Sequence, residues 1–333
     1  MSLNRLLARP VRRAALALCA AAVLTACGGG DRAEPFDPDR LVAFGDELSV
    51  LTPADASDPV NKPAGRKYSV NYYDTSTKAL VCTSNPIWVQ RVASHFDMAF
   101  EQCPNGLTTF RAVSKAVVGA RVQDLEAQVQ AFLSTGNPND KDVVTMLVGF
   151  HDLEAVYAAH ASDASSAAAE KEMADLGERL AKQVYDVSRA GPAVLLALMP
   201  AYDRSPWARD VVKNPDRVKK LVTAFNEGLQ SGGPTPGEPN SRKGIGYYKL
   251  KGDSVGLVNL SLSWIESVAR NSEDRNKTAL CPASTPLPDC DNRNLANDNN
   301  EDNWVWADAT HPGPGFHDQV GAQATTLAER NPF

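Results

Sequence analysis

An acid and an imidazole at fixed spacing form the first group in this 333-residue chain that could do chemistry. Asp308 and His311 are three residues apart in Asp-Ala-Thr-His-Pro. A carboxylate in that position can orient an imidazole and stabilise its protonated form. An isolated pair of this kind is usually a solvated loop pair, so its meaning depends on the other residues that the fold brings to it.

A carboxylate near the start of the chain follows a short apolar run. Leu41 to Ala43 is typical of a strand, and Gly45 then allows a sharp turn into a helix that begins near Glu47. Turns of this kind hold side chains at the carboxyl edge of a parallel sheet, where open α/β folds bind ligands. We therefore expect Glu47 at a ligand-binding edge.

Two further glycines close apolar segments and bring a second imidazole. Gly119 follows Ala-Val-Val, and glycine is the residue that allows a close backbone approach to a developing oxyanion. The apolar run 143–148 ends at Gly149 and is typical of a buried parallel strand. His151 follows that glycine and is expected at the same edge of the sheet.

Taken together, these segments resemble the four sequence blocks of the SGNH, or GDSL, hydrolases, in the family's order and over most of the mature chain. Phe44-Gly45-Asp46-Glu47-Leu48-Ser49 is similar to block I, which reads Gly-Asp-Ser-Leu around the nucleophile. Residues 116–121 resemble block II, 149–152 resemble Gly-x-Asn-Asp of block III, and 308–312 match Asp-x-x-His-Pro of block V. The resemblance implies that Gly119 and the third residue of block III donate to an oxyanion, while Asp308 and His311 serve an acyl nucleophile.

Two positions depart from the family pattern. Glu47 stands where the family has its nucleophilic serine, and His151 stands where it has asparagine. A carboxylate has no hydroxyl proton for His311 to remove, and an ion pair between them would raise the histidine pKa and weaken it as a base. Ser49 is a poor replacement, because it lies two residues further into the turn and should leave the site in another direction.

Three hypotheses for function follow. In the favoured one, acyl-hydrolase activity is lost or greatly reduced, and the protein is a surface binding or scaffold lipoprotein. In the second, Glu47 and His311 activate water by general-base catalysis. In the third, Glu47, His151 and His311 bind a zinc or iron ion with Asp308 behind His311. No other cofactor is expected, since nucleotide-binding glycine motifs are absent, and whether the chain is an enzyme stays open.

Alternating strand and helix patterns predict an α/β fold. We expect a three-layer α/β/α sandwich with a mostly parallel, flavodoxin-like central sheet. It should form one domain over 40–333, with polar insertions near 51–83 and 271–303. A single Ala- and Glu-rich helix is predicted from about Leu153 to Ser188, and an extended segment over 109–118.

The N-terminus has the pattern of a bacterial lipoprotein. Residues 1–26 combine four arginines with a short apolar stretch, which is typical of a signal peptide. Leu-Thr-Ala-Cys resembles a lipobox, so Cys27 is expected to carry lipid, followed by a flexible tether over 27–39. Gly28 after that cysteine favours the outer membrane, with the protein facing the periplasm or the cell surface.

Charge narrows the possible partners. Removing the signal peptide takes away four arginines and no acids, so the net charge moves from −6 to −10. An acidic surface argues against nucleic acid as a partner and against electrostatic docking on anionic lipids. We expect a monomer whose partner is the bilayer, through acylated Cys27, and the resemblance implies an ester or acetylated-glycan ligand.

Four cysteines remain in the mature chain, namely Cys82, Cys103, Cys281 and Cys290. In an oxidising periplasm they predict two disulfides, for which three connectivities exist. We expect the local pairs Cys82 with Cys103 and Cys281 with Cys290. A metal site is less favoured, since no Cys-x-x-Cys pair occurs.

Overall fold

The structure, a computed structural model, describes residues 36–231, 243–248, 254–259, 278–296 and 304–329. Phe36–Phe333 forms one compact unit. The predicted signal peptide, Cys27 and the tether as far as residue 35 lie outside the described residues, as do 271–277 and 297–303 of the second insertion. Along the described part of the chain, no helix has both the length and the apolar character needed to cross a membrane.

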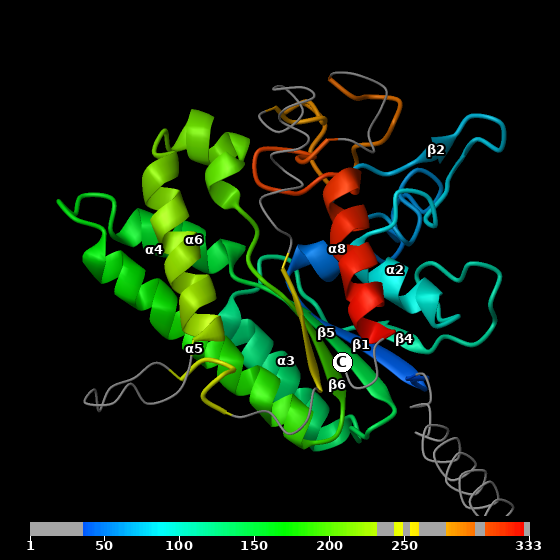
Figure 1. The fold of residues 1–333 in the computed structure, drawn as a ribbon. Coiled ribbons are helices and arrows are strands. Elements are labelled where there is room, and N and C mark those ends of the chain that lie inside the picture. The colour runs from blue at the N-terminus through cyan, green and yellow to red at the C-terminus, as the bar shows by residue number, and fades with distance from the viewer. Residues whose placement is uncertain (1–35, 232–242, 249–253, 260–277, 297–303, 330–333) are drawn as a thin grey trace, which may run out of the picture. The chain divides into compact units, whose positions relative to one another are not determined.

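A five-stranded parallel sheet lies at the centre of the unit (Figure 1). Its order is β4-β1-β5-β6-β7, and each neighbouring pair is parallel. The strands are β1 (Arg40–Gly45), β4 (Ala112–Ser114), β5 (Asp142–Leu147), β6 (Ala193–Ala197) and β7 (Val255–Val258). The first strand of the sheet therefore lies inside it, and this doubly wound order creates a switch point between β1 and β5, where such folds bind ligands.

Helices cover both faces of this sheet, which confirms the predicted three-layer fold class. On one face lie α3 (Val122–Thr135), α4 (Phe150–Ala159), α5 (Ala167–Arg189) and α6 (Pro215–Gln230), and on the other α2 (Trp88–His95) and α8 (Pro314–Ala328). Side chains alternate along β1, because successive residues of a strand point to opposite faces. Val42 and Phe44 pack with the α3–α6 layer, and Leu41 and Ala43 with α2 and α8.

The first insertion carries short elements beside the sheet. It contains the hairpin of β2 (Tyr73–Asp74) and β3 (Ala79–Leu80), whose strands pair antiparallel.

Three further short elements lie outside this insertion, namely η1 (Glu47–Ser49), η2 (Tyr202–Arg204) and η3 (Trp207–Val211). Both predicted local disulfides are present, Cys82–Cys103 and Cys281–Cys290.

Two predicted elements differ from the structure. The single helix expected from Leu153 to Ser188 is two helices, α4 and α5, separated at 160–166. Polar side chains in this stretch form local contacts, such as His160 Nδ1 to Asp163 Oδ2 at 2.6 Å, and these compete with continuous helix. The extended segment 109–118 forms a regular strand only over Ala112–Ser114, although Val117 N–H still donates to the Gly45 carbonyl.

Candidate active site

The site lies at the carboxyl ends of β1 and β5, at the switch point of the sheet. Gly45 has φ +135°, and a Cβ there would stand 1.9 Å from the Leu147 carbonyl oxygen, so only glycine fits this close crossing. The Gln128 side chain, from α3, accepts from Gly45 N–H at 2.9 Å and donates to its carbonyl at 3.1 Å. Asp46 then accepts from Leu48 N–H at 3.1 Å and begins η1. These contacts fix where Glu47 leaves the backbone.

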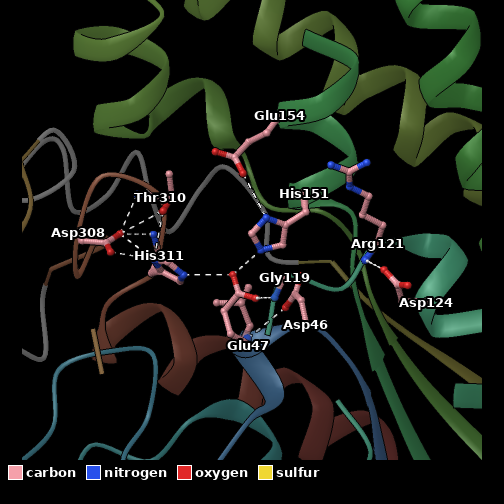
Figure 2. Close-up of polar contacts among 11 residues, drawn as sticks. Asp46, Glu47, Gly119, Arg121, Asp124, His151, Glu154, Asp308, Thr310 and His311 are labelled. Carbon is pink, nitrogen blue, oxygen red and sulfur yellow. Dashed lines mark hydrogen bonds and ion pairs between the residues drawn. The ribbon is translucent and has the colours of Figure 1, made fainter. Parts of the chain in front are cut away.

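The Glu47 carboxylate is at the centre of the site (Figure 2). Its Oε2 accepts from the Gly119 N–H at 2.9 Å. Its Oε1 lies 2.6 Å from His151 Nε2 and 3.1 Å from His311 Nε2. The side chain is only 3% exposed. Both carboxylate oxygens are therefore bonded by the groups that the family resemblance assigns to the oxyanion and to the nucleophile.

Carboxylates also lie behind both imidazoles. Glu154 Oε2 is 3.1 Å from His151 Nδ1, and Asp308 Oδ2 is 2.8 Å from His311 Nδ1. The five side chains form an alternating row of acid and imidazole, which we call the acid–imidazole chain: Glu154, His151, Glu47, His311 and Asp308. Each imidazole has an acid at both nitrogens, an arrangement that favours its doubly protonated, cationic form.

The pKa values agree with this charge pattern. Burial lowers the pKa of His311, but hydrogen bonds with Asp308 and Glu47 outweigh it and raise the value to about 9. Hydrogen bonds with Glu154 and then with Glu47 raise the pKa of His151 to about 10. Burial raises the pKa of Glu47, yet its bonds from both histidines and from Gly119 bring the net value below the usual range. At neutral pH the centre is thus an ionised carboxylate between two imidazolium ions.

Asp46, beside this centre, has the opposite protonation. Burial and the neighbouring Glu47 charge raise the pKa of Asp46 to about 8. It is therefore mostly protonated at neutral pH. Of the two acids in this turn, the ionised one at neutral pH is Glu47, which faces the histidines.

Hydrogen bonds between side chains and the backbone hold the surrounding loops in place. Asp152 accepts from Val122 N–H at 2.9 Å, which joins the first turn of α4 to the first residue of α3 and fixes the Gly119 loop opposite His151. Ser69 Oγ donates to the Pro312 carbonyl at 3.0 Å, so the first insertion supports the loop of His311. Sequence reasoning missed these supports and Glu154. Glu154 had a signal, because residues three apart on a helix are neighbours.

The remaining candidate residues lie elsewhere. Ser49 is fully buried, and its Oγ accepts from Trp88 Nε1 at 3.1 Å, so its side chain does not face the Glu47 carboxylate. His317 is buried beside α2, 3.5 Å from Trp88 N–H. His95 and His160 lie close to surface acids.

A metal ion finds no built site within the part of the chain that the structure describes, where no group of three or more His, Cys, Asp or Glu side chains is arranged to hold one. His151 Nε2 and His311 Nε2 both approach one oxygen, Oε1 of Glu47, at ion-pair distance. The metal hypothesis is left as a prediction from the residue types.

Comparisons with known proteins give structural matches of low identity and low TM-score. No protein-family model and no curated protein matches the sequence. A lipase from a goat rumen metagenome is 11% identical over 88% of this chain and 99% of its own, with a TM-score of 0.45. An acetylxylan esterase from Geobacillus stearothermophilus is 13% identical over 89% and 97%, with a TM-score of 0.42.

A member of the lipolytic protein G-D-S-L family from Veillonella parvula is 12% identical over 86% of this chain and 96% of its own, with a TM-score of 0.41. These similarities leave the function to be judged from the geometry of the site.

Proposed function

We propose that this protein is an SGNH-type envelope lipoprotein whose site has lost ester hydrolysis and keeps a binding or scaffold role. The observation that carries the proposal is the position of the Glu47 carboxylate. It takes up the Gly119 N–H and both histidine Nε2 atoms, the groups that an acyl-transfer site would offer to its nucleophile and oxyanion. An ester carbonyl entering the site would meet donors that are already bonded.

Loss of the nucleophile follows from the chemistry of the side chain. Attack by a carboxylate on an ester would give a reactive mixed anhydride, and Glu47 has no proton that His311 could remove. His311, held as imidazolium between two acids, has no free nitrogen lone pair at neutral pH. The two steps that acyl transfer needs, activation of the nucleophile and stabilisation of the oxyanion, are therefore both blocked.

General-base hydrolysis is disfavoured on the same grounds. A base that activates water is most effective when its pKa is near the working pH. The pKa of Glu47 lies below the usual range, because both histidines and Gly119 bond its charged form. Its two oxygens are also buried, which leaves little room for a water within reach.

The lipid anchor is proposed from the sequence alone, through the lipobox at Cys27. Mass spectrometry of the protein from a membrane fraction tests it. A mass that begins at Cys27 and carries acyl chains supports the anchor. A chain that is unmodified at this cysteine contradicts it.

Short-chain p-nitrophenyl esters test the loss of hydrolysis. We expect the unaltered protein to release nitrophenol no faster than its His311→Ala variant does. Glu47→Ser should gain activity, because serine restores the hydroxyl while Gly119, His311 and Asp308 stay in place. Hydrolysis by the unaltered protein that His311→Ala abolishes would overturn the proposal.

A further inference from the structure

Exposed apolar side chains gather in one segment of the chain, residues 107–118, which we call the edge segment. Among the described residues, eight large apolar side chains are exposed, and five of them lie here, between 37% and 55% exposed. These five are Leu107, Phe110, Val113, Val117 and Val118. Such concentration in one segment is the usual mark of an interaction surface.

Charge separates the edge segment from the rest of the protein. Acids outnumber bases by 40 to 34 in the whole chain, yet no acid occurs between Glu101 and Asp124. That stretch carries three bases, Arg111, Lys115 and Arg121. Exposed apolar side chains with the exposed Lys115 among them, in a stretch of sequence without acids, suit a surface of anionic lipid headgroups, with Asp39 and Asp97 bordering the segment at Arg111.

The edge segment runs from the start of the folded unit to the site. Arg111 donates to the carbonyl oxygens of Pro38 and Asp39 at 3.3 and 3.4 Å, directly before β1. The segment then follows β4 along the edge of the sheet (Figure 1) and ends beside Gly119, which bonds Glu47. At about 3.3 Å per residue, the path from Arg111 to Val117 spans about 20 Å.

The length of the chain before the folded unit limits how far this surface could be from a bilayer. Eight residues, Gly28 to Pro35, separate the proposed lipid anchor at Cys27 from Phe36. Even fully extended, they would reach only about 30 Å. Phe36 packs edge-on against Phe96, whose carbonyl accepts from Arg111 at 3.1 Å. The chain thus leaves the folded unit beside the edge segment.

We infer that the edge segment lies on an anionic lipid bilayer and holds the folded unit against it. The lipid anchor in this inference rests on the proposed function, whereas the apolar and basic character of the surface does not.

Vesicle flotation tests the surface without the anchor. Phe36–Phe333 is one compact unit, so a protein that begins at Gly28 retains all of it. We expect it to float with vesicles of phosphatidylethanolamine and phosphatidylglycerol. Phe110→Ser/Val117→Ser/Val118→Ser should lower binding about tenfold.

A variant that removes one charge separates the electrostatic contribution to vesicle binding from the apolar one. Lys115→Ala should lower binding to the anionic vesicles about fivefold and leave binding to phosphatidylcholine vesicles unchanged. Matched controls elsewhere on the surface are Val60→Ser/Val211→Ser and Lys219→Ala, which should bind like the unaltered protein. Circular dichroism confirms that each variant is folded.

Two results would overturn the inference: no binding to anionic vesicles, or equal losses in the controls and in the edge-segment variants. Ester hydrolysis measured on the same samples tests the loss of activity separately. Mass analysis at Cys27 does the same for the anchor. Failure of either proposal would therefore be distinguishable from failure of the lipid surface.

Discussion

Replacing Glu47 by glutamine removes one charge from the centre of the acid–imidazole chain and keeps the shape of the side chain. The amide oxygen can still accept from Gly119 N–H. The amide nitrogen, however, would face two imidazole Nε2 atoms that are donors at neutral pH. Glu47→Gln should therefore lower both histidine pKa values, while Asp308 and Glu154, which still bond the Nδ1 atoms, keep them above the ordinary 6.5.

The magnitude follows from the two histidines. The pKa of His311 rises from 6.5 to about 9, which at about 1.4 kcal/mol per pKa unit corresponds to at most about 3.5 kcal/mol, shared between Asp308 and Glu47. His151 is more exposed to screening, so Glu47 contributes about 1 kcal/mol there. We expect Glu47→Gln to lower the free energy of unfolding by about 2–3 kcal/mol at pH 6.

The dependence on pH has a definite sign. A histidine with a raised pKa contributes stability that is complete below pH 6.5 and is lost as pH rises through its folded value, here about 9 to 10. The gap between the unaltered protein and Glu47→Gln should therefore be largest near pH 5–6.5 and shrink toward pH 10.

Urea unfolding, followed by tryptophan fluorescence at several pH values, measures the gap. Glu172→Gln is the control, because Glu172 pairs with His160, a histidine outside the acid–imidazole chain. Equal stability of Glu47→Gln and the unaltered protein at pH 6, or a gap that grows as pH rises to 10, would refute the charge pattern assigned to the site.

Three further variants and one elemental analysis test other parts of the account. Gln128→Leu should lower the free energy of unfolding in urea by about 1–3 kcal/mol, because the Gly45 N–H and C=O lose a buried partner. Gln123→Leu, on the same helix, should lower it little, and equal effects of the two variants would contradict this role of Gln128. Gly45→Ala should lower the free energy of unfolding by at least about 3 kcal/mol, since the added Cβ would overlap a main-chain oxygen of β5. A stable, soluble variant would contradict that geometry. Cys82→Ser/Cys103→Ser should cost about 2–4 kcal/mol, and no loss of thermal stability would show that this disulfide constrains little. Elemental analysis should find far less than one zinc or iron per chain, with no thermal shift on adding either ion; one bound ion per chain would favour the metal hypothesis instead.

Much of the fold could be predicted because its signals are local. Apolar runs bounded by glycine mark β1 and β5, and helical spacing marks α3, α6 and α8. The break between α4 and α5 could not be predicted from composition alone. That stretch is rich in alanine and acids throughout, and the interruption depends on local contacts of His160 and Asp163.

The site could be predicted as a set of residues but not as an arrangement. Block order placed Glu47, Gly119, His151 and His311 at one edge of the sheet. The sequence could not tell which atoms would meet, and in the structure one oxygen, Oε1, faces both imidazoles. The second acid behind His151, Glu154, belongs to a helix that was expected to begin later, so its approach went unnoticed.

Covalent labelling at position 47 tests the central claim most directly, namely that a carboxylate occupies the nucleophile position of a site that keeps Gly119, His311 and Asp308. The unaltered protein, Glu47→Ser and Glu47→Ser/His311→Ala would each be treated with a fluorophosphonate and examined by intact mass and peptide mapping. We predict one phosphonyl group at position 47 in Glu47→Ser and none in the other two proteins. Labelling of the unaltered protein at another residue of the site, or no labelling of folded Glu47→Ser, would contradict the account.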